Sequence, residues 1–168
     1  MKMRRIFLAV NLPQDAKRTI QGWQKEFFGL PIRLTKPDSL HLTLCFIGDV
    51  TDEETVEICW VTREIAKKYP SFILNFHRLC LGPPNKPARL IWLEGDLPQA
   101  LVDLKNELES RLIGLAKNFK PEKRGFTSHI TLARIKPFEW RKLSPAPVID
   151  KKISLGFSVN SVDVMESE

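Results

Sequence analysis

The chain has 168 residues, of which 43% are apolar, and its 26 Lys and Arg residues outnumber its 20 Asp and Glu residues. This length suits one domain with a real core, and the apolar content excludes a disordered chain. The net charge of +6 is compatible with a polyanionic partner such as nucleic acid, although many basic proteins merely have a solvated basic surface.

Three cysteines, Cys45, Cys59 and Cys80, have neither zinc-site nor redox-motif spacing, so we expect buried free thiols in a reducing compartment. The basic N-terminal residues are followed by an apolar run of only about five residues before Pro13, which is too short for a signal peptide. No apolar stretch approaches the length of a membrane span. The sequence therefore predicts a soluble cytoplasmic protein with no membrane partner, and we expect a monomer because no long apolar patch demands a second copy.

The first half of the chain predicts a strand, a helix, a second strand and a second helix. Residues 4–12 are rich in β-branched and aromatic residues, and apolar positions then recur at helical spacing over residues 14–28. Turn-forming residues open and close a strand over 37–49. Thr51 has the properties of an N-cap and Glu54 completes a capping box, which predicts a helix that ends near residue 69.

The second half predicts strands over 71–81 and 88–95, a long amphipathic helix over 97–117 and a basic loop over 119–125. A strand over 126–135, a helical turn over 138–143 and closing strands over 151–160 and 161–167 follow. The apolar face of the long helix carries Leu101, Leu104, Leu108, Leu112 and Leu115. This order predicts an α+β fold built from a duplicated unit, with mainly antiparallel sheets.

A short phrase occurs twice in this histidine-poor chain. LHLTLCFIG occupies residues 40–48 and HITLARI occupies residues 129–135, so two of the three histidines share the frame His-x-Thr-Leu. Side chains alternate along a strand, so His41 and Thr43 are expected on one face of the first strand. His129 and Thr131 are expected on one face of the second. The third histidine, in NFHRL, has no such frame and is expected to be structural or exposed.

Alternation also predicts the surroundings of the first motif. Leu42, Leu44 and Phe46 should face the core, whereas Cys45 should share the face of His41. We expect no catalytic role for Cys45, because nothing nearby in the sequence would lower the pKa of its thiol.

Two histidines suit acid–base chemistry near neutral pH, since one can accept a proton while the other donates one. Hydroxyl groups beside them can donate hydrogen bonds to negative oxygens. A phosphate held between the two His-Thr pairs would meet a base on one side and an acid on the other, which suits in-line displacement at phosphorus without a metal. The competing hypothesis of a metal site lacks carboxylates or cysteines at ligand spacing.

The paired His-x-Thr-x motifs resemble the signature of the 2H phosphoesterase superfamily. RRIFLAVNLP, LHLTLCFIGDV, ARLIWLEG and FTSHITLARIK are similar, in this order, to blocks of the bacterial and archaeal RNA 2′,3′-cyclic phosphodiesterases, long called 2′-5′ RNA ligases. The resemblance implies a single bilobal domain over residues 1–168, with a pseudo-two-fold axis and a basic central cleft. It also implies hydrolysis of RNA 2′,3′-cyclic phosphate ends to a 2′-phosphate, and joining or cleavage of 2′-5′ linked RNA, with no metal or other cofactor.

The resemblance also assigns roles to individual residues. His41 and His129 would be the acid and the base, with His41 protonating the leaving 3′ oxygen and His129 activating the water. Thr43 and Thr131 would hold the phosphate oxygens. Arg134 matches the arginine that follows the second motif in the family, and it would contact phosphate or RNA.

Arg134 poses a geometric problem, because strict alternation places it on the opposite face from His129. It reaches the cleft only if the strand ends or bulges around Ala133, and it is otherwise a solvated arginine. A protein that binds RNA without turnover is a second functional hypothesis, but the intact His and Thr residues of both motifs argue against it. Three more basic residues could either rim the cleft or be merely solvated: Lys36, Lys123 and Arg124.

Overall fold

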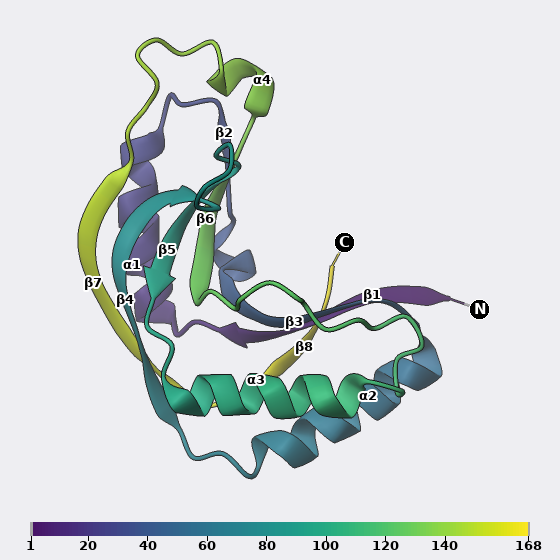
Figure 1. Cartoon of the computed structure of the whole chain (residues 1–168). Helices are drawn as coiled ribbons and strands as arrows, with labels where there is room; N and C mark the ends of the chain where they lie inside the picture. Colours follow the sequence, from purple (N-terminus) through teal and green to yellow (C-terminus); the bar gives the residue numbers. More distant parts are fainter. Residues whose placement is uncertain (1, 168) are drawn as a thin grey trace.

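The computed structural model describes residues 2–167, which form two antiparallel sheets joined by a shared core (Figure 1). The three-stranded sheet has the order β3-β1-β8 and the five-stranded sheet has the order β2-β6-β5-β4-β7. This arrangement confirms the predicted α+β class with antiparallel sheets.

The three-stranded sheet consists of β1 (Met3–Asn11), β3 (His41–Thr51) and β8 (Asp163–Glu166). Helices α2 (Asp52–Ala66) and α3 (Gln99–Leu112) pack against each other and cover this sheet. Both helices lie together below the sheet in Figure 1. The capping box at the start of α2 is present as predicted, since the Glu54 amide donates to Thr51 Oγ1 and the Thr51 amide donates to Glu54 Oε2.

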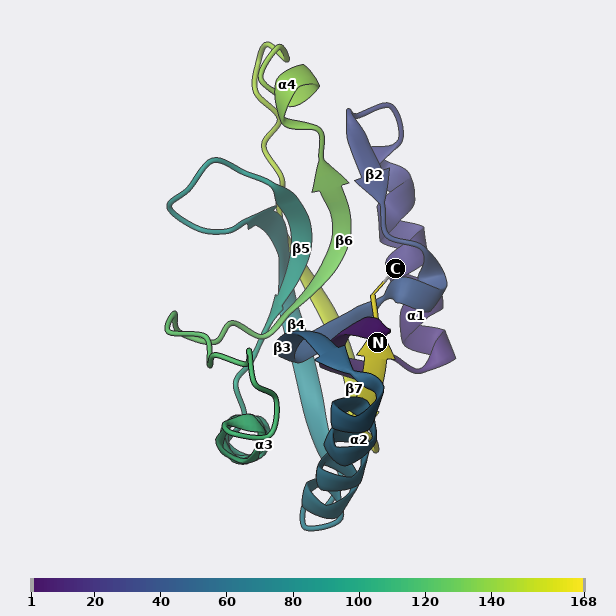
Figure 2. The same cartoon turned by 90° about the vertical axis from the view of Figure 1, so that its right-hand side faces the viewer.

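The five-stranded sheet consists of β2 (Ile32–Leu34), β6 (His129–Ile135), β5 (Leu90–Gly95), β4 (Phe72–Gly82) and β7 (Asp150–Val159). Helix α1 (Gln14–Gln24) contacts β6 and β7, and it lies beside β2 in the view of Figure 2. The short helix α4 (Pro137–Trp140) follows β6. Each sheet is therefore covered partly by a helix that follows a strand of the other sheet, because α1 follows β1 and α3 follows β5.

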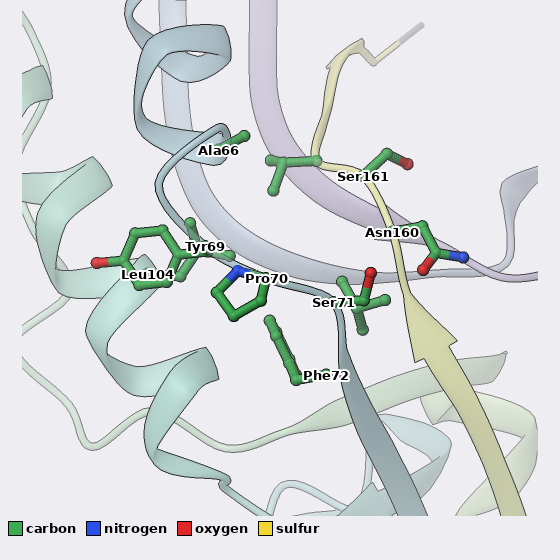
Figure 3. Close-up of a pocket in the computed structure, with 10 residues that line it drawn as sticks. Ala66, Tyr69, Pro70, Ser71, Phe72, Leu104, Asn160 and Ser161 are labelled. Carbon is green, nitrogen blue, oxygen red and sulfur yellow. The ribbon is translucent and has the colours of Figure 1, made fainter.

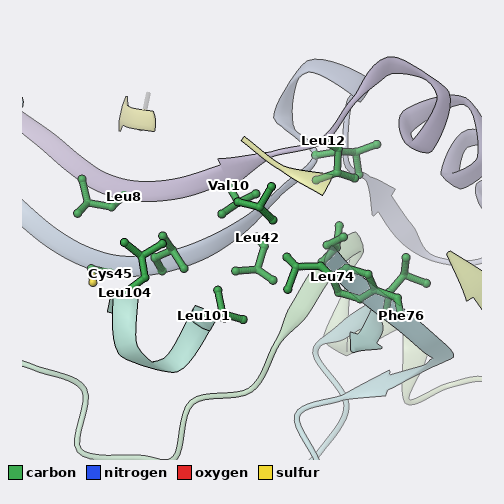
Figure 4. Close-up of a cluster of buried hydrophobic side chains, with 14 of the residues drawn as sticks. Leu8, Val10, Leu12, Leu42, Cys45, Leu74, Phe76, Leu101 and Leu104 are labelled. Carbon is green, nitrogen blue, oxygen red and sulfur yellow. The ribbon is translucent and has the colours of Figure 1, made fainter. Parts of the chain in front are cut away.

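A single cluster of buried apolar side chains joins the two sheets (Figure 4). Leu8 and Leu42 enter it from the three-stranded sheet, Leu74 and Phe76 from the five-stranded sheet, and Leu101 from α3. Burial of one such side chain contributes roughly 1.5–3 kcal/mol to folding. The shared core therefore fixes the position of the sheets, and with them the positions of the two His-Thr motifs.

The predicted elements agree with the structure in type and order, and they differ mainly at their ends. The predicted long helix stops at Leu112 rather than near residue 117, since the chain turns at Gly114 with a φ of 85°. Residues Pro37–Ser39 form a 3₁₀ turn, so β3 begins only at His41. Strand β2 was not predicted, because three residues are too few to show a periodic pattern.

Two predictions about side-chain direction in β3 are wrong, because the strand contains a bulge. Thr43 pairs with Ala9 and Cys45 pairs with Leu8, so Leu44 is an extra residue between them. The bulge turns Cys45 into the core, where it is 3% exposed, and turns Phe46 outward, where it is 51% exposed. Burial also raises the pKa of the Cys45 thiol to about 12.

The expectation that the thiols are buried holds for only two of the cysteines. Cys45 and Cys80 are buried, whereas Cys59 is exposed on α2. All three are free thiols, as predicted.

Candidate active site

The structure brings the two His-Thr motifs into one cleft between the sheets. Strands β3 and β6 contact each other across this cleft. A cavity of about 600 Å³ is lined by His41, Thr43, His129, Thr131 and Arg134. All five residues that the sequence predicts for the site therefore face the same space.

Both imidazoles are oriented in the same way by the backbone. His41 Nδ1 lies 2.7 Å from the carbonyl oxygen of Ser39, and His129 Nδ1 lies 3.0 Å from that of Thr127. A carbonyl oxygen can only accept, so Nδ1–H donates in each ring and Nε2 of the neutral imidazole is left as an acceptor. His41 Nε2 lies 3.1 Å from Thr43 Oγ1, which is a possible donor to it.

A bulge brings Arg134 to the cleft. Trp92 pairs with Thr131 and Ile91 pairs with Ala133, so Leu132 is an extra residue. Beyond this extra residue each side chain points to the face opposite to the one that strict alternation predicts. Arg134 therefore joins Thr131 on the cavity wall. The bulges in β3 and β6 lie at the same distance from their histidines, which makes Phe46 and Arg134 equivalent positions of the two halves.

Burial lowers the pKa of both histidines below the ordinary value of 6.5, but the charges around them differ. The positive charges of His129 and Arg134 lower the pKa of His41 further, against the effect of its hydrogen bond to Ser39. The pKa of His129 is instead raised towards its usual range by its hydrogen bond to Thr127 and by the negative charge of Glu94.

Strand pairing explains this difference in charge. Asn11 is the register partner of His41, whereas Glu94 is the register partner of His129. Residues that pair directly across two antiparallel strands project from the same face. Trp92 links the two groups on this face, because its ring centroid lies 4.3 Å from that of His129 and its Nε1–H donates to Glu94 Oε1 at 3.3 Å.

A second cavity, of about 440 Å³, adjoins the first and shares Thr43, Leu90 and His129 with it. Three aromatic side chains line it, Phe46 from β3, Trp92 from β5 and Phe126 from the loop before β6. Basic residues also contribute to its wall: Lys86, Arg89, Lys105 and Arg124.

Sequence reasoning missed this aromatic cavity. Phe46 was expected in the core, and no signal connected Trp92 with Phe126, which is far from it in sequence. Of the three basic residues considered near the motifs, Lys36 lines the 600 Å³ cavity and Arg124 lines the 440 Å³ cavity. Lys123 lines neither of them.

Three further features of the described chain bear on its function. A cavity of only about 60 Å³ near the end of α2 is lined by Tyr69, Pro70 and Phe72, among others, and is too small for a nucleotide (Figure 3). Within residues 2–167, no three His, Cys, Asp or Glu side chains are grouped so as to hold a metal ion. Over the same residues, no helix combines the length and apolarity that crossing a bilayer requires.

Comparison with known proteins identifies the family. Residues 10–92 match the model of the LigT-like phosphoesterases. The RNA 2′,3′-cyclic phosphodiesterase of Methanocaldococcus jannaschii is 31% identical over 140 residues, which cover 82% of this chain and 75% of that protein. The protein of the same name from Escherichia coli K12 is 30% identical over 137 residues, covering 77% of this chain and 71% of that protein.

Solved structures show the same fold. A Thermus thermophilus protein superposes with a TM-score of 0.83 at 24% identity, over 98% of this chain and 88% of that one. Escherichia coli LigT in complex with NADP+ superposes with a TM-score of 0.71 at 26% identity, over 99% of this chain and 89% of that one. The chain belongs to the LigT-like phosphoesterase family, which confirms the resemblance seen in its sequence.

Proposed function

We propose that the protein hydrolyses 2′,3′-cyclic phosphate ends of RNA to 2′-phosphates. The observation that carries this proposal is the convergence of two imidazoles, two threonine hydroxyls and the Arg134 guanidinium on one cavity of about 600 Å³. The curated relatives at 30–31% identity are named for this reaction. The arrangement supplies each group that opening of a cyclic phosphodiester requires.

The reaction follows from the placement of these groups. One histidine removes a proton from water, and the water oxygen bonds to phosphorus in line with the 3′ oxygen. The bond from phosphorus to the 3′ oxygen breaks, and the second histidine gives that oxygen a proton. Thr43, Thr131 and Arg134 donate hydrogen bonds to the non-bridging oxygens, where negative charge accumulates. The products are a 2′-phosphate and a free 3′ hydroxyl group.

The direction of proton transfer is open to a direct test. The resemblance assigns the acid role to His41, whereas the protein's own charges favour the proton on His129, since Glu94 lies beside His129 and Arg134 acts on His41. An aryl phosphodiester has a good leaving group that needs no acid. Replacement of the acid by alanine should therefore spare hydrolysis of bis(p-nitrophenyl) phosphate, while replacement of the base should not.

The aromatic cavity supports an RNA substrate. A nucleobase stacks well on aromatic rings, and the basic residues along the same wall suit phosphate groups further along a strand. With the reacting phosphate between the histidines, the base of the terminal nucleotide would occupy the 440 Å³ cavity.

The two adjoining cavities also support action on 2′-5′ linked RNA. A linkage between two nucleotides needs room for one nucleoside on each side of phosphorus, and the cavities of about 440 and 600 Å³ provide it. Joining of RNA ends by the protein would be the same ring opening with a 5′ hydroxyl group in place of water. The 5′ oxygen bonds to phosphorus, the bond from phosphorus to the 3′ oxygen breaks, and the 3′ oxygen receives a proton, which leaves a 2′-5′ linkage.

One assay tests the main proposal. An RNA ending in a 2′,3′-cyclic phosphate is incubated with the protein in the presence of EDTA, and the product is analysed. We expect a 2′-phosphate, because the histidines supply both proton transfers without a metal or other cofactor. An absence of hydrolysis would refute the proposal, and a 3′-phosphate would refute the direction of ring opening. Binding of the RNA with no turnover would favour the binding-protein alternative.

The setting of this activity is part of the proposal. We infer that the protein acts as a single bilobal domain and as a monomer, because both catalytic motifs come from one chain. Its free thiols suit a reducing cytoplasm. Size-exclusion chromatography with light scattering would show a dimer if the monomer assignment were wrong.

A further inference from the structure

Lys105 lines the aromatic cavity and forms a largely buried ion pair with Glu109, which has no role in the proposed reaction. Lys105 Nζ lies 2.5 Å from Glu109 Oε1, one turn along α3, and the Lys105 side chain is only 8% exposed. The same ammonium lies 5.0 Å from the ring centroid of Phe126, which lines the cavity with it.

Stability alone does not account for this pair. Removal of two charges from water is expensive, and replacement of a buried ion pair by apolar residues of similar volume is often neutral or stabilising. The same face of α3 is otherwise occupied by leucines, such as Leu101, Leu104 and Leu108, which are buried without such a penalty. The charged pair interrupts this apolar face where the helix meets the cavity.

We propose that Lys105 selects the nucleobase by donating a hydrogen bond to a carbonyl oxygen on the edge of the base farthest from the ribose. This inference rests on the proposed function, which places the terminal base in the aromatic cavity. His129 and Thr43, which also line the 600 Å³ cavity, would hold the phosphate, Trp92 and Phe46 contribute aromatic rings to the wall, and the base edge would meet Lys105.

The chemistry of the four bases makes the selection specific. An ammonium group has three donors and no acceptor, and Glu109 accepts one of the three here. Guanine O6 and uracil O4 are acceptors, whereas adenine N6 and cytosine N4 are donors at the corresponding positions. The protein should therefore prefer guanine and uracil to adenine and cytosine, by at least about fivefold in kcat/KM.

The test compares four nucleoside 2′,3′-cyclic monophosphates as substrates of two doubly substituted proteins and the wild type. Lys105→Met with Glu109→Leu removes both charges and leaves no buried carboxylate without its partner. The matched control is Lys67→Met with Glu64→Leu, which removes an exposed ion pair from α2. We expect the preference to disappear in the first variant and to remain in the control.

Wild-type protein alone provides a second measurement, which does not depend on the folding of a variant. Inosine and adenosine 2′-monophosphates carry an oxygen or an amino group at position 6 and differ otherwise only in the proton on N1, and inosine should bind at least about fivefold more tightly. Equal affinity would overturn the inference, as would a preference that persists in the folded Lys105→Met/Glu109→Leu protein. Failure to hydrolyse any cyclic nucleotide would refute the proposed function instead, and the binding comparison would still decide the role of Lys105.

Discussion

Replacement of Arg134 by alanine tests the consequence of the β6 bulge most directly. If the bulge delivers this guanidinium to the reacting phosphate, the variant loses charge-assisted hydrogen bonds worth about 1.5–3 kcal/mol in total. This loss corresponds to a decrease in kcat/KM of about 10- to 150-fold. The kcat/KM of Arg134→Lys should fall between those of the wild type and of Arg134→Ala, because lysine keeps the charge but lacks the planar fork of donors.

The same substitution has a second, independent effect on His41. Burial is the main reason that the pKa of His41 is low, and the charge of Arg134 lowers it further. Removal of that charge must therefore raise the pKa of His41, which moves one limb of the pH–rate profile to higher pH. A solvated arginine that pointed away from the cleft would produce neither effect.

Two measurements on the wild type and three variants complete this test. Steady-state hydrolysis of a nucleoside 2′,3′-cyclic monophosphate across the pH range gives kcat/KM, and NMR titration of the imidazole gives the pKa of His41. Arg63→Ala, on the exposed side of α2, serves as the control and should match the wild type. A change in kcat/KM within about twofold for Arg134→Ala, or an unchanged pKa of His41, would show that the reasoning about the bulge is wrong.

Three further predictions concern catalysis, pH and stability. His41→Ala and His129→Ala should each lower kcat by at least about 100-fold, and the control His77→Ala should leave kcat unchanged. A normal kcat in the His41 or the His129 variant would remove that residue from the mechanism. Burial lowers the pKa of both histidines proposed as acid and base below 6.5, so kcat/KM should reach its maximum on the acid side of pH 6.5. Glu94→Gln should move the His129 limb of the profile to still lower pH, and a maximum in alkaline solution would contradict this sign. Thr51→Ala removes one half of the α2 capping box. Urea unfolding should show that the free energy of unfolding falls by about 1 kcal/mol, while kcat stays unchanged. An unchanged free energy of unfolding would mean that the cap is redundant.

Local sequence patterns were sufficient to predict most elements of this protein and the two motifs of its site. The capping box of α2 and the buried leucine face of α3 are encoded within one or two helical turns. The pairing of His41 with Thr43 on one strand face, and of His129 with Thr131 on another, follows from a period of two. These features could be predicted because the interactions that create them join residues close together in the chain.

Tertiary structure decided what lies around those motifs. A bulge exists only relative to a partner strand, so the extra residues Leu44 and Leu132 became visible only with the registers of β3 on β1 and of β6 on β5. These two residues determine that Phe46 and Arg134 face the cleft and that Cys45 does not. The aromatic cavity likewise combines β3, β5 and the loop before β6, which only the packing of the two sheets brings together. The sequence by itself determined which side chains could perform acid–base chemistry, and long-range strand pairing determined what surrounds them, because that pairing depends on contacts between residues far apart in the chain.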